Sequence, residues 1–155
     1  MSDTEPSISR RQFCAGTAAA ALATIFSGCS GSSSSPSSTG NPATPLAKAA
    51  GQFTANSVKV TVSGSALANV GGAVLVESVA GVYLLARTSD SAFSAIEAVC
   101  THEGCTITGA DASVYVCPCH GSRYDRSGHV LAGPAKASLR QYANTFAGDV
   151  VTIAI

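Results

Sequence analysis

Apolar and polar residues alternate with a period of two through much of this chain. Between Val58 and Val62 every second residue is Val, and Lys59 and Thr61 lie between them. Such alternation is typical of a β-strand with one buried face. Further short apolar runs, separated by Gly, Ser or Asp, lie at 73–76, 82–85, 93–99, 114–116 and 149–155. No segment carries an apolar stripe at helical spacing, so the pattern predicts an all-β domain, an antiparallel sandwich or barrel.

The region before these strands has the features of a targeting signal. In residues 1–29, Ser9-Arg10-Arg11-Gln12-Phe13 matches a twin-arginine export signal and precedes a mostly Ala apolar run at 15–26. The closing Phe26-Ser27-Gly28-Cys29 resembles a bacterial lipobox, in which the Cys is lipidated. We therefore expect export by the twin-arginine (Tat) route and lipidation at Cys29. The alternative is a signal that stays uncleaved as a membrane anchor.

Residues 30–45 are rich in Ser, Pro and Gly and carry no charge. A segment of this composition cannot bury a core and is expected to be a flexible tether. The folded domain is accordingly expected from 46 to 155. The anchor and the tether together predict a domain held at the periplasmic or extracytoplasmic face of a membrane.

Composition narrows the classes of function. The 155 residues include nine Lys and Arg and nine Asp and Glu, so the chain lacks the net positive charge that favours binding to nucleic acid. Charged residues make up only 12% of the chain, and 27 of its apolar residues are Ala, which buries little surface. A core this small favours a domain that a cross-link or a metal stabilises.

The candidates for such a site are two short clusters of Cys and His. The first reads Cys100-Thr101-His102-Glu103-Gly104-Cys105, and the second reads Cys117-Pro118-Cys119-His120-Gly121-Ser122. Each cluster follows a predicted strand, so each is expected to form a tight loop. Two such loops facing each other can converge on one metal site.

The residue types alone leave three interpretations open. Structural zinc would use four of the six Cys and His residues in a tetrahedron. Two disulfides would leave the His residues without a role. An iron–sulfur centre with mixed Cys and His ligands is the third possibility. The spacing, with 14 residues between His102 and Cys117, leaves one surplus Cys in each loop, Cys105 and Cys119. A zinc site has no use for that symmetric surplus.

The two clusters resemble the boxes of a Rieske [2Fe-2S] domain, Cys-Thr-His-x-Gly-Cys and Cys-Pro-Cys-His-Gly-Ser. The resemblance continues to Tyr124 and to Gly133-Pro134-Ala135, which is similar to the family's proline loop. The 14 residues between His102 and Cys117 are slightly few for the family, which implies a trimmed hairpin. The implied fold is a small antiparallel Rieske-type β-sandwich with a cluster-binding subdomain of two loops.

The resemblance also implies one [2Fe-2S] cluster and a role for each residue of the boxes. Its ligands would be Cys100 and Cys117 on one iron and His102 and His120 on the other, with a disulfide between Cys105 and Cys119. The third His, His129, lies outside both boxes and is expected at a strand or surface without a ligand role.

Mixed ligation has an electrostatic consequence. An oxidised centre of two ferric ions, two sulfides, two thiolates and two neutral imidazoles carries no net charge, whereas four thiolates would make it a dianion. An electron is added more easily to the neutral centre, in line with potentials of about −150 to +300 mV for Rieske centres and about −400 mV for plant-type ferredoxins. In high-potential members a Ser and a Tyr donate hydrogen bonds to the cluster. Ser122 and Tyr124 hold these positions, which predicts the upper part of the range.

The resemblance implies a one-electron carrier that does not catalyse alone. The leading hypothesis is the iron–sulfur subunit of a quinol-oxidising cytochrome bc-type complex or a related respiratory chain, with quinol, cytochrome b or cytochrome c as partners. There the second-box His, here His120, accepts the proton of the quinol.

Glu103 argues for a more polar partner, because that family often has Leu at this position and a carboxylate is costly to bury. The first alternative is therefore a small Rieske subunit of another periplasmic oxidoreductase. A zinc-binding module for a protein partner is a second alternative. A third is the ferredoxin of a Rieske-type oxygenase, a class that usually lacks the disulfide pair and is cytoplasmic.

Overall fold

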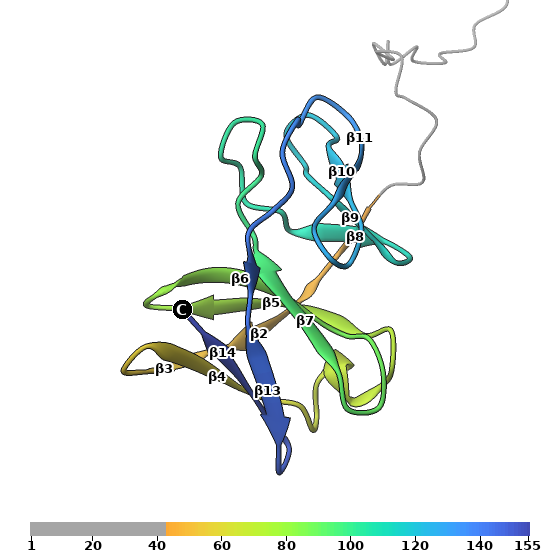
Figure 1. The fold of residues 1–155 in the computed structure, drawn as a ribbon. Coiled ribbons are helices and arrows are strands. Elements are labelled where there is room, and N and C mark those ends of the chain that lie inside the picture. The colour runs from red at the N-terminus through yellow and green to blue at the C-terminus, as the bar shows by residue number, and fades with distance from the viewer. Residues whose placement is uncertain (1–42) are drawn as a thin grey trace, which may run out of the picture. The chain divides into compact units, whose positions relative to one another are not determined.

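The computed structural model describes residues 43–155, so the expectations for the export signal, for Cys29 and for most of the tether lie outside it. Within 43–155 the chain forms strands and one 3-10 turn, η1 (Ala66–Ala68), without an α-helix, which confirms the all-β prediction (Figure 1). No helix in this part of the chain is long and apolar enough to cross a membrane. The strands are β1 (Thr44–Pro45), β2 (Ala47–Ala50), β3 (Gln52–Thr54), β4 (Ser57–Thr61), β5 (Ala73–Ser78), β6 (Gly81–Arg87), β7 (Phe93–Glu97), β8 (Gly109–Asp111), β9 (Val114–Val116), β10 (Arg123–Tyr124), β11 (Val130–Ala132), β12 (Gln141–Tyr142), β13 (Asn144–Ala147) and β14 (Val150–Ala154).

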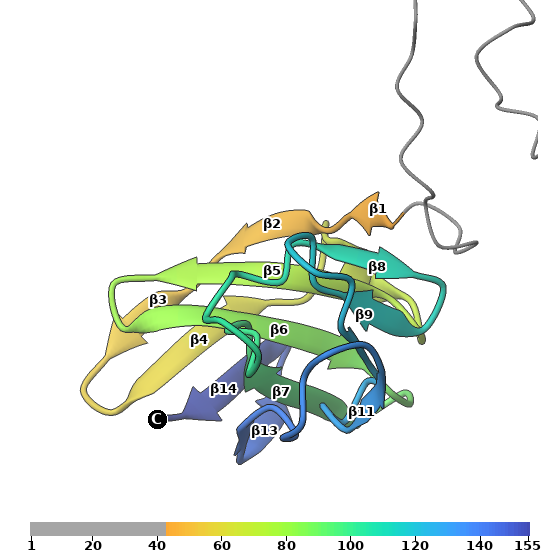
Figure 2. The same ribbon diagram turned by 90° about the horizontal axis from the view of Figure 1, so that it is seen from above.

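These strands form three sheets (Figure 2). The middle sheet has the order β12-β7-β6-β5-β2, and a second sheet has the order β13-β14-β4-β3. The third sheet, β1-β8-β9-β10-β11, is continuous with the loops that hold the Cys and His clusters. Strand pairs are antiparallel as predicted, except that β2 runs parallel to β5.

The middle sheet buries both of its faces. Leu75 and Leu84 point into a core that also contains Tyr115 of the third sheet. Val74 and Leu85, the next residues along the same strands, point into a separate core with β4 and β14. Because successive residues of a strand point to opposite faces, a strand covered on both sides must be apolar throughout. The unbroken apolar runs at 73–76 and 82–85 therefore mark strands with no solvent face.

The strand β4 shows the other pattern. Val58 and Val60 are buried in the core beneath the middle sheet, whereas Lys59 between them is exposed. The alternation in the sequence thus identifies a strand of an outer sheet, with one face in water.

The N-terminal arm of the described chain connects two sheets. Thr44 of β1 lies opposite Ala110 of β8, and the Leu46 N–H donates to the Thr108 carbonyl at 2.8 Å. The chain then continues into β2 at the edge of the middle sheet. Strand pairing in the described chain thus already includes Thr44 and Pro45, which belong to the segment expected to be a tether. The strand β1 contributes backbone pairing and no buried side chain, so composition could not reveal it.

Candidate metal centre

The two Cys and His clusters occupy loops with the same backbone pattern, one between β7 and β8 and the other between β9 and β10. In each loop the N–H of the first Cys donates to the carbonyl of the residue five positions later in the chain. The carbonyl of the same Cys accepts the N–H of the Gly four positions later. The distances are 2.8 and 2.9 Å in the loop that starts at Cys100, and 2.8 and 3.0 Å in the loop that starts at Cys117. The two glycines, Gly104 and Gly121, have φ of 74° and 70°, a conformation that favours Gly.

A disulfide joins the two loops. Cys105 and Cys119 are bonded, with their Cα atoms 6.5 Å apart, as the resemblance implied. A metal binds the thiolate form of Cys, and a disulfide sulfur has no thiolate to offer. The two surplus Cys residues therefore form the cross-link, and four candidate ligands remain.

These four residues form two pairs, two thiols and two imidazoles, on the two loops that the disulfide joins. The thiols of Cys100 and Cys117 are free, and each residue is 2% exposed. The rings of His102 and His120 lie with their centroids 4.9 Å apart and their planes at 87°. The Nδ1 atom of His102 is buried without a hydrogen-bond partner, a situation that a bond to a metal would satisfy. Two thiols and two imidazoles fit a mixed-ligand iron–sulfur centre, and they equally fit structural zinc.

Two buried hydroxyl groups, those of Tyr124 and Ser122, belong to the region of the second box. Tyr124 of β10 is fully buried, and its hydroxyl oxygen lies 3.3 Å from the Sγ atom of Cys100. Ser122 is also fully buried, and its Oγ accepts the N–H of Ala135 at 3.2 Å. Tyr124 thus contacts a candidate ligand, whereas the hydrogen bond of Ser122 connects the second loop to the proline loop.

The two thiols have different acidities. Burial raises the pKa of the Cys100 thiol, but hydrogen bonds from the Tyr124 hydroxyl and the His102 backbone N–H outweigh burial and bring the pKa below its ordinary value. Burial raises the pKa of the Cys117 thiol, and the neighbouring Cys100 adds to the rise. The hydroxyl of Tyr124 thus stabilises negative charge on the sulfur of Cys100.

The predicted proline loop braces both Cys and His loops. Gly133 packs so closely on the second loop that a Cβ atom at this position would lie 2.6 Å from the Cα atom of Ser122. Two residues later in the chain, the N–H of Ala135 donates a hydrogen bond to the Ser122 hydroxyl oxygen. The Ala137 carbonyl then accepts the hydroxyl of Thr101 in the first loop at 2.6 Å. The segment therefore fixes the two loops relative to each other.

Glu103 lies at the exposed end of this arrangement. One carboxylate oxygen lies 4.0 Å from His102 Nε2, and the other lies 3.6 Å from His120 Nδ1. The side chains of Glu103 and His120 are 61% and 47% exposed, against 27% for His102. The second-box imidazole is therefore the one more open to a partner.

Some contacts of the centre could not be read from the sequence. Thr101 belongs to the first box, but its hydroxyl partner Ala137 is 36 positions away. His129 is exposed, as expected for a surface residue, and its Nδ1 lies 3.2 Å from a carboxylate oxygen of Asp125.

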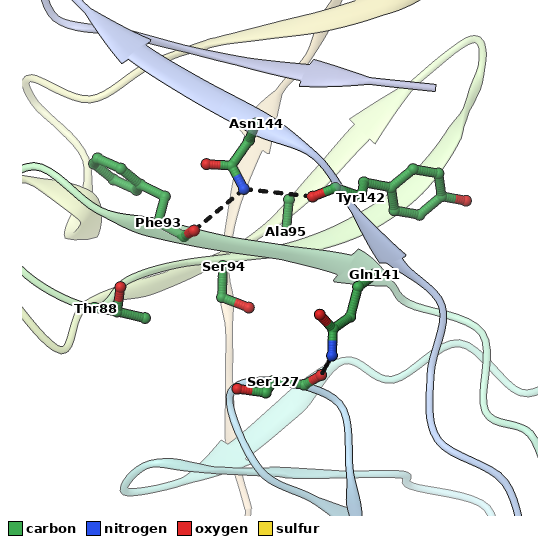
Figure 3. A pocket seen from close by; sticks show the side chains of 8 residues that line it. All are labelled: Thr88, Phe93, Ser94, Ala95, Ser127, Gln141, Tyr142 and Asn144. Atoms are coloured by element: carbon green, nitrogen blue, oxygen red, sulfur yellow. Dashed lines mark hydrogen bonds between the residues drawn. The ribbon is translucent and has the colours of Figure 1, made fainter.

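A separate hollow of about 400 Å³ lies where β12 leaves the edge of β7 (Figure 3). The Asn144 amide donates there to the carbonyls of Phe93 and Tyr142, and the Gln141 amide donates to the Ser127 carbonyl. These side chains satisfy backbone acceptors at the edge of the sheet. The residues that line the hollow include no Cys, His or carboxylate, so it lacks the groups of the metal centre.

Comparisons with known proteins agree with this geometry. The family model for the Rieske [2Fe-2S] domain matches residues 51–143. The cytochrome b6-f complex iron-sulfur subunit of Chlorobaculum thiosulfatiphilum is 43% identical over 63 residues, which are 40% of this chain and 35% of the relative. The cytochrome b6-f complex iron-sulfur subunit 2 of a Synechocystis species is 42% identical over 88 residues, which are 54% of this chain and 48% of the relative. The chain thus spans less than half the length of these curated relatives.

A solved structure shows a similar fold. It is a chain in the complex of reduced oxygenase and oxidized ferredoxin in carbazole 1,9a-dioxygenase, with 26% identity and a TM-score of 0.52. The similarity covers 64% of this chain and 93% of that chain.

Proposed function

The chain belongs to the Rieske [2Fe-2S] domain family, and on this premise we propose that it is an exported iron–sulfur subunit of a quinol-oxidising cytochrome bc-type complex or a related respiratory chain. Family membership assigns one [2Fe-2S] cluster as the cofactor and electron transfer as its chemistry. The relatives named as subunits of cytochrome b6-f complexes support the finer assignment. The observation that carries it is an exposed His120 at the tip of a centre whose thiols are buried.

Each residue of the site has a part in this function. The cluster, when bound, takes up and releases one electron. The buried thiols of Cys100 and Cys117 would hold one iron, and the imidazoles of His102 and His120 would hold the other. The partner then meets the imidazole of His120, which is the more exposed ring and offers a nitrogen to a quinol hydroxyl.

Removing the hydroxyl of Ser122 or of Tyr124 is expected to lower the midpoint potential. A hydrogen bond to a charged group contributes about 1.5 kcal/mol, and a tenfold change in a one-electron equilibrium corresponds to about 59 mV. Ser122→Ala and Tyr124→Phe should each lower the potential by about 60 mV, because the reduced centre carries the extra negative charge. Redox titration followed by electron paramagnetic resonance measures the shift. Unchanged potentials in both variants would exclude this role for the two hydroxyls.

Glu103 supports a second candidate, a small Rieske subunit of another periplasmic oxidoreductase. Its carboxylate is exposed and lies 3.6 Å from His120 Nδ1, on the surface that a partner must approach. An apolar docking site would have to bury this charge, whereas a polar protein surface can solvate or pair it.

The disulfide between Cys105 and Cys119 argues against the oxygenase ferredoxin, despite the similar fold of the carbazole dioxygenase complex. It forms and persists in an oxidising compartment. That requirement supports export by the twin-arginine route, with Arg10-Arg11 as the signal and a lipid on Cys29 as the anchor at the extracytoplasmic face.

Purification of the full chain from its own membranes tests the assignment. An affinity-tagged protein extracted in mild detergent should carry a Rieske resonance signal together with b-type haem, about two haems per Rieske cluster, in reduced-minus-oxidised spectra. A Rieske signal without haem b would reject the bc-type complex and favour the polar oxidoreductase partner.

The matched control is Cys29→Ser. Loss of the lipid should move the protein to the soluble fraction and remove the haem from the preparation, while the Rieske signal remains. A variant that stays in the membrane and whose purified chain still contains residues 15–26 by mass spectrometry would show that this apolar run is kept as an uncleaved anchor.

A further inference from the structure

The hydroxyl of Tyr124 is surrounded by three polar groups of the first loop. Its oxygen lies 3.3 Å from Cys100 Sγ, 3.1 Å from the Thr101 hydroxyl oxygen and 3.3 Å from the Thr101 backbone nitrogen. The Thr101 hydroxyl oxygen also lies 2.6 Å from the Ala137 carbonyl oxygen. One residue, Thr101, therefore contacts Tyr124 twice and the proline-loop segment once.

The chemistry of these groups assigns the protons. A carbonyl oxygen can only accept, so the Thr101 hydroxyl donates its single proton to Ala137. The Thr101 N–H donates to the Tyr124 oxygen. The proton of Tyr124 is then left with two acceptors, the Thr101 hydroxyl oxygen and Cys100 Sγ, which as an iron ligand is a thiolate without a proton.

We propose that Thr101 is a positioning residue that sets how much of the Tyr124 hydrogen bond reaches Cys100. Its backbone N–H turns the tyrosine oxygen toward the loop. Its side-chain hydroxyl donates its proton to the Ala137 carbonyl, so toward Tyr124 the oxygen can only accept. It therefore competes with the Cys100 sulfur for the tyrosine proton. This inference rests on the proposed ligand role of Cys100 and is independent of the redox partner.

Ser122 shows the same arrangement without the competitor. Its oxygen accepts a backbone N–H, that of Ala135, which leaves its proton directed elsewhere. No second acceptor hydroxyl within hydrogen-bond distance of Ser122 is found in residues 43–155. The comparison isolates the Thr101 oxygen as the feature that weakens one of the two hydroxyl donors.

The test is the midpoint potential of the cluster-loaded full chain with Thr101→Val. Valine keeps the shape of threonine and removes only the competing oxygen, so the tyrosine proton passes wholly to Cys100. The equilibrium constant for reduction should rise by about threefold, which is about 28 mV for one electron. A threonine that merely braces the loop predicts the opposite sign, because a looser loop admits water and weakens the Tyr124 contact.

Two further variants make the result decisive. Thr101→Ser keeps the oxygen and should keep the wild-type potential. Thr101→Val in a Tyr124→Phe background should leave the potential of the single Tyr124→Phe variant unchanged. A lowered or unchanged potential in Thr101→Val would overturn the proposal.

The outcomes also separate this inference from the proposed function. If Tyr124→Phe alone leaves the potential unchanged, the donor role of Tyr124 fails, and the competition proposed for Thr101 fails with it. If Tyr124→Phe lowers the potential but Thr101→Val does not raise it, only the competition fails. If Thr101→Val does not retain the cluster, Thr101→Ala removes the same oxygen and should show the same rise. Loss of the cluster from both variants would show a bracing role and overturn the proposal.

Discussion

Gly133→Ala will destabilise the folded domain by about 3 kcal/mol and prevent stable retention of the cluster. The added methyl group would lie 2.6 Å from Ser122 Cα and 3.0 Å from both Ser122 N and the Gly121 carbonyl oxygen. All three are backbone atoms, so no side-chain rotation relieves the contact. The proline loop must move away, and Ala135 then withdraws its hydrogen bond from the Ser122 hydroxyl.

Urea unfolding of the loaded protein and its visible absorbance during dialysis measure the two effects. Gly71→Ala is the matched control, because Gly71 has a similar φ of 86° but no atom near its added methyl group. It should cost about 1 kcal/mol and keep the cluster. Equal losses in the two variants would mean that left-handed strain, and not contact with the second loop, explains Gly133.

Replacement of both disulfide cysteines will remove about 3 kcal/mol of stability, the value that the chain-entropy model gives for a loop of about 15 residues. Cys119 is exposed and Cys105 is half-buried, so the double substitution Cys105→Ala and Cys119→Ala creates little cavity. The loss of stability then reports the loss of the cross-link. The cross-link holds the two ligand-bearing loops together, and its loss should also hasten loss of the cluster.

The measurement is the free energy of unfolding in urea, with and without a thiol reductant. Reductant should bring the wild-type value down to that of the double variant and leave the variant unchanged. An oxidised wild type no more stable than the double variant would show that the loops are held by the proline loop and the backbone bonds alone.

The sequence predicted the strands long enough to show a periodic or unbroken apolar pattern and missed most of the two- and three-residue strands. The alternation of Val58 and Val60 with Lys59 marks β4 because one face meets water. The two-residue strand β10 (Arg123–Tyr124) is held by pairing to β9 and β11, and so short a segment has no periodicity to detect. The unbroken apolar runs at 73–76 and 82–85 were expected to be strands, but a sandwich or barrel does not include the third sheet that covers their second face.

At the site, the boxes identified the cysteines and histidines, and the structure confirms the Cys105–Cys119 disulfide that the resemblance implied. The contacts made by Thr101 and Gly133 could not be predicted from the sequence. Each joins residues of distant segments, and their meeting depends on how the proline loop folds back over the boxes. Local sequence determines the ligand set, whereas tertiary packing determines how its charge is stabilised.

The disulfide also changes what a break in the chain would mean. The hairpin of β8 and β9 lies inside the covalent ring that the disulfide closes, and its tip at Ala112 and Ser113 is exposed. A protease that cuts this tip separates the polypeptide into two pieces, each with one complete box. The sulfur bridge still links these pieces directly beside the centre. After such a cut, the disulfide alone would join the two pieces covalently, so the two boxes can stay together without an intact hairpin backbone.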